Sequence, residues 1–457
     1  MAKSDFSIEI FNTYSNICNM SKKSKTATYI IEFETGLTKR DRDICEKQLR
    51  VGRQIYNRAL SVLKKRAIRL HRDPEYIALS KELSEVSKKN EAEKEDIKSL
   101  TKAERERRDE IVGQILELRK KYKIQGDYCA NDIATEMRQY YGKALYSSVI
   151  CKLCQRAYQT VRRMEQTSVS KKLPDGTKRA MSFEEKIHSV RFVSADDDFS
   201  IENINDKGGL RLKNGLLYFN KNTAIDVDMD KVHSDPYYEL AMQDRIKFAR
   251  LVSRTIRGKK RYYVQLAMEG TPPMINRSYG DGTVELMDVK ISHYDVVDGN
   301  GEIKTVELAP GCRRNEEKIA ELNRKMDASR RATNPNKYNP DGTINAKNKD
   351  PWVYSNRYRK LRTQYHELQR KNAELRKVTL EKQANDILEV GTNINLRHLS
   401  YKDLQKRKSK TEINEKTGMP KSKAMAGKEI GNRSPGYFVQ CIKRKAEYVG
   451  GTVTDLS

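Results

Sequence analysis

The most constraining feature of this sequence is a predicted β-strand that stands far from the other strands of its domain. Residues 26–33 read TATYIIEF, a β-branched and aromatic run that is typical of a strand. The next strand-like runs, with turn signals between them, begin at residue 190. We therefore expect one small antiparallel β-domain, with the helical block 39–166 inserted after its first strand.

The inserted block is predicted to be helical and strongly charged. Apolar residues recur in its first helix at spacings of seven, four and three, which places them on one face. These residues are Ile44, Val51, Ile55, Ala59 and Val62. Glu and Lys then alternate through residues 73–123, a pattern typical of a solvated helical hairpin with i,i+4 charge pairs. Residues 127–164 predict a further helical pair, and residues 165–186 predict a loop.

The β-domain is expected to resume after this loop and to end at a boundary rich in Pro and Gly. Residues 213–215 (KNG) and 257–260 (RGKK) lie between alternating runs, so each predicts a hairpin. The boundary is the segment 271–282. Beyond it we expect strands, a helix from Asn315, a long helix over 354–375 and a final strand. Periodicity alone shows only mixed α and β structure in this part.

The net charge favours nucleic acid as the partner. Lys and Arg number 90 and Asp and Glu number 63 in 457 residues, a net charge of +27. Many cations that neutralise phosphates give strong, salt-dependent affinity. The alternative is a basic protein that self-repulsion keeps soluble. A membrane-surface protein is disfavoured because the charge is spread along the whole chain.

Composition excludes two other classes of protein. No apolar run reaches about 18 residues, which excludes a membrane-spanning protein. Seven Cys residues, an odd and small number, exclude a secreted disulfide scaffold. The N-terminal residues MAKSDFSIEI show no signal-peptide pattern. We expect a reduced, cytoplasmic protein.

The sequence contains no familiar catalytic or metal-binding motif. Cys151 and Cys154 form a single CxxC pair inside a helical pattern, so structural cysteines are expected. The six His residues are scattered. Asp226, Asp228 and Asp230 lack the glycine and the terminal Glu of a calcium loop. We expect no bound metal and no small-molecule cofactor.

Four segments carry a resemblance to a known family. IYNRAL (55–60) is similar to a segment early in that family's first helix, and residues 251–270 resemble the hairpin before its nuclease domain. NINLRHLSYKDLQKR (393–407) resembles the family's strand that ends in a catalytic Glu, and residues 427–451 resemble the helix that follows. In these segments, and in the order of its elements, the chain resembles the TnpB transposon-encoded RNA-guided nucleases, ancestors of type V CRISPR effectors.

The resemblance implies a multidomain α+β fold. Residues 1–38 would form an N-terminal tail and the first strand of a β-barrel-like wedge domain, and residues 39–186 an inserted helical recognition domain. Residues 187–280 would complete the wedge domain. Residues 281–457 would form a degenerate, C-terminally truncated RuvC-like domain with an RNase H fold and no zinc ribbon.

The nuclease site that the resemblance implies is expected to be degenerate. The family cuts DNA with two metal ions held by Asp, Glu and Asp from separate strands, and such ions need several carboxylates to offset their charge. Asp288 aligns with the first Asp, but Lys290 replaces a Gly beside it and Arg397 stands in place of the Glu. The third Asp and the zinc ribbon are expected after residues 436–451, and the sequence ends at Ser457 before either. We expect no nuclease activity.

With these departures the chain looks like the TnpB-like nuclease-dead repressors (TldR). These proteins keep guide RNA and target binding and act by occupying DNA. Base pairing with the guide would supply sequence discrimination, while the protein holds the heteroduplex through its backbone and shape. The expected partners are a guide RNA and double-stranded target DNA, with no membrane partner. We expect a monomer in the cytoplasm, at the bacterial nucleoid.

Two sets of residues are candidates for contacting nucleic acid. Arg53, Tyr56 and Asn57, in or beside the family-like segment of the first helix, are candidates for reading the motif that flanks the target. Core packing of Tyr56 and solvation of Asn57 on the helix surface are the alternatives. The second set is expected to contact RNA or DNA backbones. It comprises Arg357, Arg359, Lys360, Arg362, Lys406, Arg407, Lys408 and Lys410.

Three other functions stay open. An active RNA-guided endonuclease would need other acids, with His398 assisting; the candidates are Asp295, Asp298 and Glu302. A sequence-independent RNA scaffold would need only a basic surface. A transposon relic would need no function at all. Metal-dependent cleavage of a matched target distinguishes the first function, and binding without guide dependence distinguishes the second.

Overall fold

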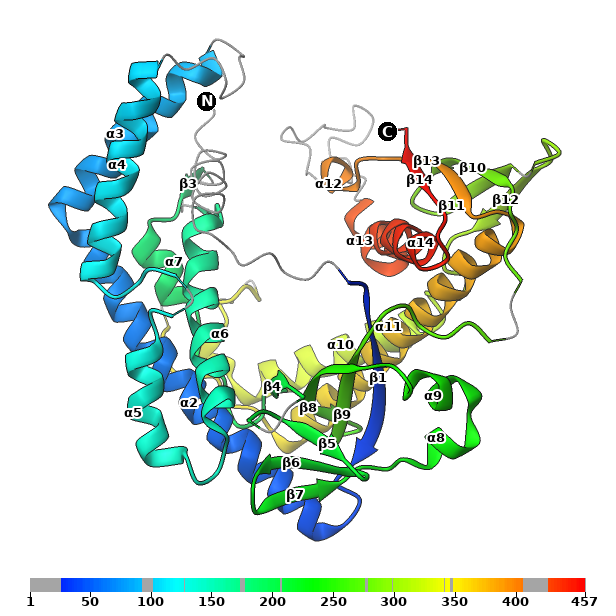
Figure 1. The fold of residues 1–457 in the computed structure, drawn as a ribbon, viewed down its shortest axis with the longest axis horizontal. Helices are drawn as coiled ribbons and strands as arrows, with labels where there is room; N and C mark the ends of the chain where they lie inside the picture. The colour runs from blue at the N-terminus through cyan, green and yellow to red at the C-terminus, as the bar shows by residue number, and fades with distance from the viewer. Residues whose placement is uncertain are drawn as a thin grey trace. The chain divides into compact units, whose positions relative to one another are not determined.

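The computed structural model describes most of the chain. The described residues are 26–92, 102–126, 128–172, 177–205, 208–275, 278–297, 299–340, 342–345, 348–405 and 426–456. They form a mixed α and β fold (Figure 1). Within these ranges no helix is both long and apolar enough to cross a membrane.

The chain divides into two compact units. The first unit comprises Met1–Thr255 and Lys260–Pro273. The second comprises Ile256–Lys259 and Met274–Ser457. Each unit has its own hydrophobic core.

The first unit contains a four-stranded antiparallel sheet in which strands far apart in the sequence are neighbours. Its order is β1-β9-β8-β4. The strands are β1 (Thr28–Thr35), β9 (Lys259–Glu269), β8 (Ile246–Ile256) and β4 (Ser200–Ile204). β1 pairs with β9 from Thr28 opposite Glu269 to Thr35 opposite Tyr262. The side chains of β1 alternate between exposed and buried positions, with Ile31 and Phe33 in the core.

Helices fill the chain between β1 and β4. They are α2 (Lys39–Arg72), α3 (Pro74–Ala92), α4 (Lys102–Lys121), α5 (Asn131–Tyr141), α6 (Ser147–Gln166) and α7 (Phe183–Ser189). Thr38 caps α2, because its side chain accepts a hydrogen bond from the Asp41 backbone N–H. The apolar face of α2 packs against α6, with Leu49, Ile55 and Leu63 fully buried.

Smaller elements complete the first unit. They are β2 (Ser170–Lys172), β3 (Lys178–Ala180), β5 (Arg211–Lys213), β6 (Leu216–Asn220), β7 (Thr223–Asp226), α8 (Asp230–Ser234) and α9 (Pro236–Ala241). The hairpin predicted at KNG is confirmed: Asn214 and Gly215, at φ 52° and 74°, join β5 to β6. The second predicted hairpin is also confirmed: Arg257 and Gly258, at φ 51° and 75°, join β8 to β9 and belong to the second unit.

The second unit is built on a five-stranded sheet with the order β12-β11-β10-β13-β14. The strands are β10 (Thr283–Val289), β11 (His293–Val297), β12 (Ile303–Glu307), β13 (Asn393–His398) and β14 (Val453–Asp455). The first three strands form an antiparallel meander. β13 then runs parallel to β10, and β14 runs parallel to β13.

Helices separate the two halves of this sheet along the chain. They are α10 (Glu316–Thr333), the short 3₁₀ helix η2 (Pro335–Lys337), α11 (Asn356–Val390), α12 (Tyr401–Leu404), α13 (Ala426–Arg433) and α14 (Pro435–Tyr448). The 35-residue helix α11 has two parts, because its buried residues begin only at Leu380. Its C-terminal part supplies Ile387 and Leu388 to the core beside Phe438 of α14.

Candidate nucleic-acid interface

Asp288 and Arg397, which the resemblance aligned with a nuclease site, lie on two neighbouring inner strands of the second unit's sheet, near the edge where both strands end. β10 pairs with β13 so that Leu286 lies opposite Leu396 and Val289 opposite His398. Two residues of β10 therefore stand against Arg397 alone, which is a β-bulge. Asp288 is one of these two and has a left-handed φ of 48°, uncommon for a residue other than glycine. Asp288 and Arg397 are thus neighbours across two parallel strands.

The side chains at this edge are mostly cationic or already paired. Asp288 and Arg397 are exposed, and Lys290 is half-buried just beyond the end of β10. Asp455 of β14, opposite Leu396, is another acid near these strand ends. Its carboxylate lies 2.5 Å from Lys443 Nζ and 3.5 Å from His398 Nε2. Sequence reasoning did not name Asp455 as a site residue, although it is the single acid of the short strand Val453–Asp455.

This donor set does not fit a two-metal centre. Two divalent ions require several carboxylates, whereas Asp288 lies on the strand that pairs along the backbone with the strand that carries Arg397, and the Asp455 carboxylate is bound to Lys443 and lies near His398. Among the described residues, no group of three or more His, Cys, Asp or Glu side chains could hold a metal ion. Of the acids weighed as replacements, Asp295 accepts a hydrogen bond from Thr305 at 2.6 Å. Asp298 lies outside the described residues.

The three candidates for reading the flanking motif are engaged inside the first unit. Arg53 and Tyr56 are only 5% and 7% exposed. Arg53 Nη2 donates to Glu46 at 3.1 Å, and the Tyr56 hydroxyl lies 3.0 Å from Thr160 Oγ1. The Asn57 amide donates to the Val193 carbonyl at 2.9 Å and accepts from the Val193 N–H at 3.0 Å. These contacts give each residue a structural role, and their contact with DNA stays a prediction.

The four α11 candidates lie in the opposite environment. Arg357, Arg359, Lys360 and Arg362 are all exposed, and none of them forms an ion pair with another described residue. Arg370, two turns further along, instead binds Glu367 at 2.6 Å and Glu374 at 2.5 Å. Arg362 Nε donates a hydrogen bond to His366 Nε2 at 3.3 Å. Exposed cations without an ion pair are available to phosphates. The remaining candidates, Lys406, Arg407, Lys408 and Lys410, lie outside the described residues.

A hydrogen-bonded closure precedes this cationic part of α11. Asn334 donates to the Val353 carbonyl at 2.8 Å and accepts from the Val353 N–H at 2.9 Å, which closes the segment between α10 and α11. Tyr354 and Tyr358 stack with ring centroids 4.7 Å apart and planes 23° apart. Tyr354 is 36% exposed. An exposed stacked ring beside free cations is a combination found in single-strand binding surfaces.

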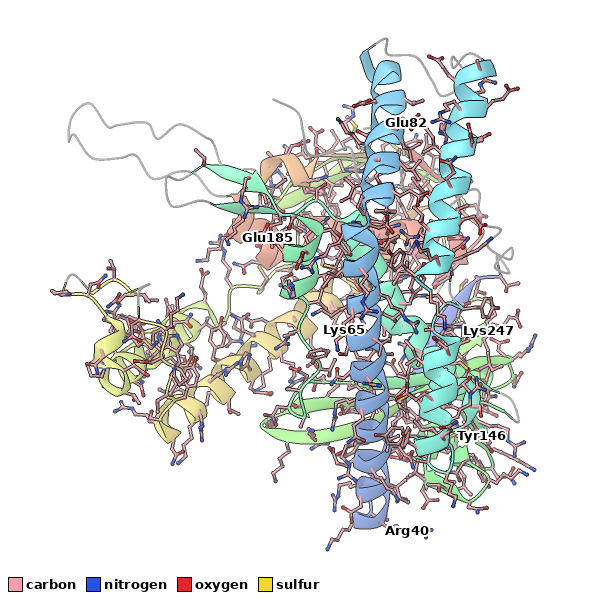
Figure 2. All side chains as sticks on the ribbon, turned by 90° about the vertical axis from the view of Figure 1, so that its left-hand side faces the viewer. Arg40, Lys65, Glu82, Tyr146, Glu185 and Lys247 are labelled. Atoms are coloured by element: carbon pink, nitrogen blue, oxygen red, sulfur yellow. The ribbon has the colours of Figure 1, made fainter. Side chains whose placement is uncertain are left out.

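Many charges of the helical insertion in the first unit are already paired with each other. Arg107 binds Glu82 of α3 at 2.7 Å, and Arg179 binds Glu185 of α7 at 2.6 Å. Figure 2 shows the side chains of these helices, with Glu82 of α3, Glu185 of α7 and Lys65 in the C-terminal part of α2 labelled. The predicted pattern of paired charge along the insertion therefore extends between helices as well as within them.

Comparisons with known proteins give little sequence likeness. No protein-family model matches the chain, and no curated protein matches it. Among solved structures, the chain is similar to that titled "Cryo-EM structure of the Cas12f1-sgRNA-target DNA complex", with 10% identity and a TM-score of 0.38 over 94% of this chain and 89% of that one. Another is "Cryo-EM structure of CRISPR-Cas12f Ternary Complex", with 12% identity and a TM-score of 0.24 over 91% and 72%. The function proposed for this chain therefore depends on its own residues and strand pairing.

Proposed function

We propose that this chain is a nuclease-inactive, RNA-guided DNA-binding protein that represses transcription by occupying its target. The observation that carries the proposal is the meeting of Asp288 and Arg397 across β10 and β13. The resemblance aligned these two residues with catalytic acids of separate strands, from sequence alone. Parallel pairing brings them together at the carboxyl ends of neighbouring strands, where α/β sheets commonly bind ligands.

The chemistry at that edge supports binding without cutting. A carboxylate that helps to hold metal ions would be replaced by a guanidinium, which repels cations and attracts phosphate. Arg397 and Lys290 outnumber Asp288 there, while Asp455 is bound by Lys443. The proposed protein would keep a strand of DNA at this edge and leave its phosphodiester bonds intact.

Two further features support nucleic acid as the partner. The net charge of +27 provides sequence-independent attraction to phosphates. Arg357, Arg359, Lys360 and Arg362 of α11 are exposed and form no ion pair with another described residue. In an RNA-guided protein the guide reads the target by base pairing, so the protein needs backbone contacts more than base contacts.

The test begins with the protein isolated from its native host at mild salt, followed by sequencing of the RNA that comes with it. We expect one dominant species with a constant part and a short variable end, and we expect DNA that matches this end to bind. A mixture of cellular RNAs that bind equally well would instead support the scaffold function. Metal-dependent cleavage of the matched DNA would support the active endonuclease.

A further inference from the structure

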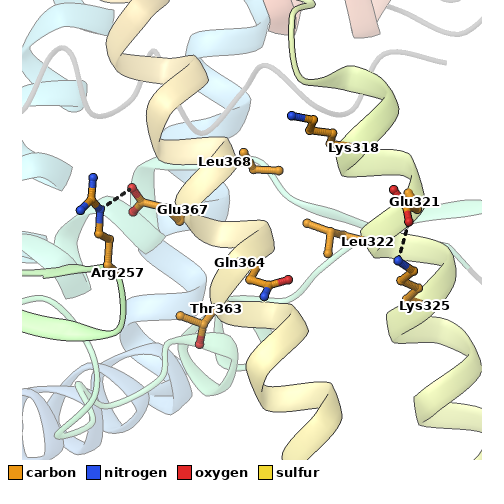
Figure 3. Close-up of a pocket in the computed structure, with 9 residues that line it drawn as sticks. All are labelled: Arg257, Lys318, Glu321, Leu322, Lys325, Thr363, Gln364, Glu367 and Leu368. Carbon is orange, nitrogen blue, oxygen red and sulfur yellow. Dashed lines mark hydrogen bonds and ion pairs between the residues drawn. The ribbon is translucent and has the colours of Figure 1, made fainter.

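A cavity between α10 and α11 has no part in the function proposed above. Its volume is about 600 Å³, and every residue that lines it belongs to the second unit. Figure 3 shows Leu322 of α10 and Gln364 and Leu368 of α11 directed into the space between the two helices. Leu322 and Leu368 are its apolar lining residues, and the other seven are polar or charged. Its volume lies within the range of small-ligand sites.

The walls and the polar group of the cavity suit a flat heteroaromatic ring. Leu322 and Leu368 are half-buried and come from opposite helices, so they offer apolar surfaces on two sides. Gln364 forms no hydrogen bond with another described residue. Its amide carries both donors and an acceptor, which is what the edge of a nucleobase requires.

The charges around the cavity favour a ligand that carries phosphate. Its two acids are already paired: Glu321 binds Lys325, and Glu367 binds Arg370 and lies 3.8 Å from Arg257 Nε. Lys318 has no ion-pair partner among the described residues. The lining thus leaves positive charge without a partner beside the apolar walls.

The cavity opens onto the free cations of α11. Arg357, Lys360, Gln364 and Leu368 follow one another at spacings of three, four and four, so they share one face of the helix. Lys360 precedes Gln364 by one turn, about 6 Å along the axis. A backbone phosphate held by Arg357 or Lys360 therefore lies one or two turns from the cavity mouth.

We propose that this cavity takes one unpaired nucleobase of a bound nucleic-acid strand, with Arg357 and Lys360 on the flanking phosphates. Leu322 and Leu368 would cover the faces of the base, and Gln364 would bind its edge. The inference rests on the proposed function only in that α11 must contact nucleic acid. It names the part of the strand that α11 recognises, which is an unstacked base rather than a duplex backbone.

Photo-crosslinking tests this proposal on the full-length protein. The probes are single strands of about twelve nucleotides, one of RNA with 4-thiouridine and one of DNA with 4-thiothymidine. We expect crosslinked peptides from residues 318–325 or 360–368 in the wild-type protein. The probe that gives the higher crosslink yield at these segments identifies the strand bound in the cavity as RNA or DNA. Crosslinks confined to other segments would overturn the proposal.

Three variants make the test specific to the cavity. Leu322→Trp fills the space, and Gln364→Ala removes the edge contact with little risk to folding. Gln369→Ala is the matched control, because it removes an exposed glutamine of the same helix outside the cavity. We expect the first two variants to lower the crosslink yield about tenfold, and the control to keep it. An unchanged yield in both Leu322→Trp and Gln364→Ala would overturn the proposal.

Guide-dependent DNA binding, measured on the same preparations, separates this inference from the proposed function. If the wild type crosslinks through the cavity but binds DNA without guide dependence, the proposed function fails and the cavity assignment holds. If DNA binding follows the guide and the cavity segments give no crosslink, only the cavity assignment fails.

Discussion

Helices α2 and α11 offer the same kinds of side chain in opposite environments. They are 34 and 35 residues long, and each carries basic residues that sequence reasoning assigned to nucleic acid. On α2, Arg53 and Tyr56 are buried and bonded to neighbouring elements. On α11, Arg357 and Arg359 are exposed and free of ion pairs with the described residues.

The difference comes from what surrounds each helix. α2 lies in the core of the first unit and packs against α6, α5 and α7, so few of its faces reach solvent. The first part of α11 packs on α10 and has no buried residue before Leu380. Substitutions in the helical core around α2 should therefore act on stability, whereas substitutions in the first part of α11 should act on binding.

The largest effect is expected at the buried ion pair behind α2. Glu165 binds Arg119 at 2.9 and 3.2 Å, and His71 of α2 lies 3.3 Å from it. Glu165→Gln would leave a buried guanidinium without its charge partner, so we expect a loss of about 3–5 kcal/mol in the free energy of unfolding. Urea denaturation measures it. Glu184→Gln, at an exposed pair with Arg72, should leave the stability nearly unchanged.

The same pair predicts a pH dependence. Burial alone would raise the pKa of Glu165, but the Arg119 charge and the His71 hydrogen bond lower it to about 2, below the ordinary value of 4.5. A carboxyl whose pKa is lowered by folding stabilises the protein at pH values above its pKa in the unfolded chain. This stabilisation is lost as the pH falls towards the pKa in the folded protein. The stability gap between wild type and Glu165→Gln should therefore narrow from pH 5 towards pH 2. A constant gap would contradict this assignment.

The next effect is expected at the buried side chain of Tyr56 on α2. Tyr56→Ala removes a buried ring, so we expect about 3 kcal/mol of destabilisation, measured by urea unfolding. Tyr56→Phe keeps the ring and loses only the hydrogen bond to Thr160, about 1 kcal/mol. If Tyr56→Ala keeps wild-type stability and abolishes binding to DNA that carries one particular flanking motif, Tyr56 acts on DNA binding and not on stability.

For substitutions in the first part of α11 we expect the reverse, which is a large change in binding and a small change in stability. We replace Arg357, Arg359, Lys360 and Arg362 together by Gln. The slope of the logarithm of the nucleic-acid binding constant against the logarithm of the salt concentration should then become less steep by roughly 3. Stability should change by no more than about 0.5 kcal/mol, because the four side chains are exposed. Titrations at several salt concentrations measure the slope. Arg370→Gln is the control, since Arg370 is already paired with Glu367 and Glu374; equal slopes for the two variants would remove α11 from the interface.

A smaller effect on stability is expected at Asn57, a half-buried residue of α2. Asn57 holds the Val193 backbone with two hydrogen bonds. Asn57→Ala should cost about 1–2 kcal/mol, seen as a lower midpoint in urea. Asn57→Asp keeps the acceptor and should recover part of this loss. If both variants unfold like the wild type but bind target DNA more weakly, Asn57 belongs to the DNA interface.

Local patterns predicted much of the fold. The alternating run 26–33 placed β1, and Asn214-Gly215 marked a hairpin because glycine adopts positive φ readily. The spacing of apolar residues located α2 and its buried face, with Leu63 and Ala67 completing the stripe. These features depend on residues close in sequence, which is why the pattern is sufficient.

The site depended on contacts that no local pattern contains. The burial of Tyr56 requires Thr160, more than 100 positions away, and the fixed position of Asn57 requires Val193. Motif alignment named Asp288 and Arg397, but the bulge that sets them opposite each other is a property of strand pairing. The cavity beside Gln364 exists only because α10 packs on α11.

The decisive experiment offers the guide-loaded protein a matched DNA duplex in the presence of Mg²⁺ and follows both retention and strand length. We expect that the matched duplex is bound, that a scrambled duplex is not, and that both strands stay intact. Cleavage of the matched duplex, or equal binding of the scrambled one, would show that the proposed function is wrong.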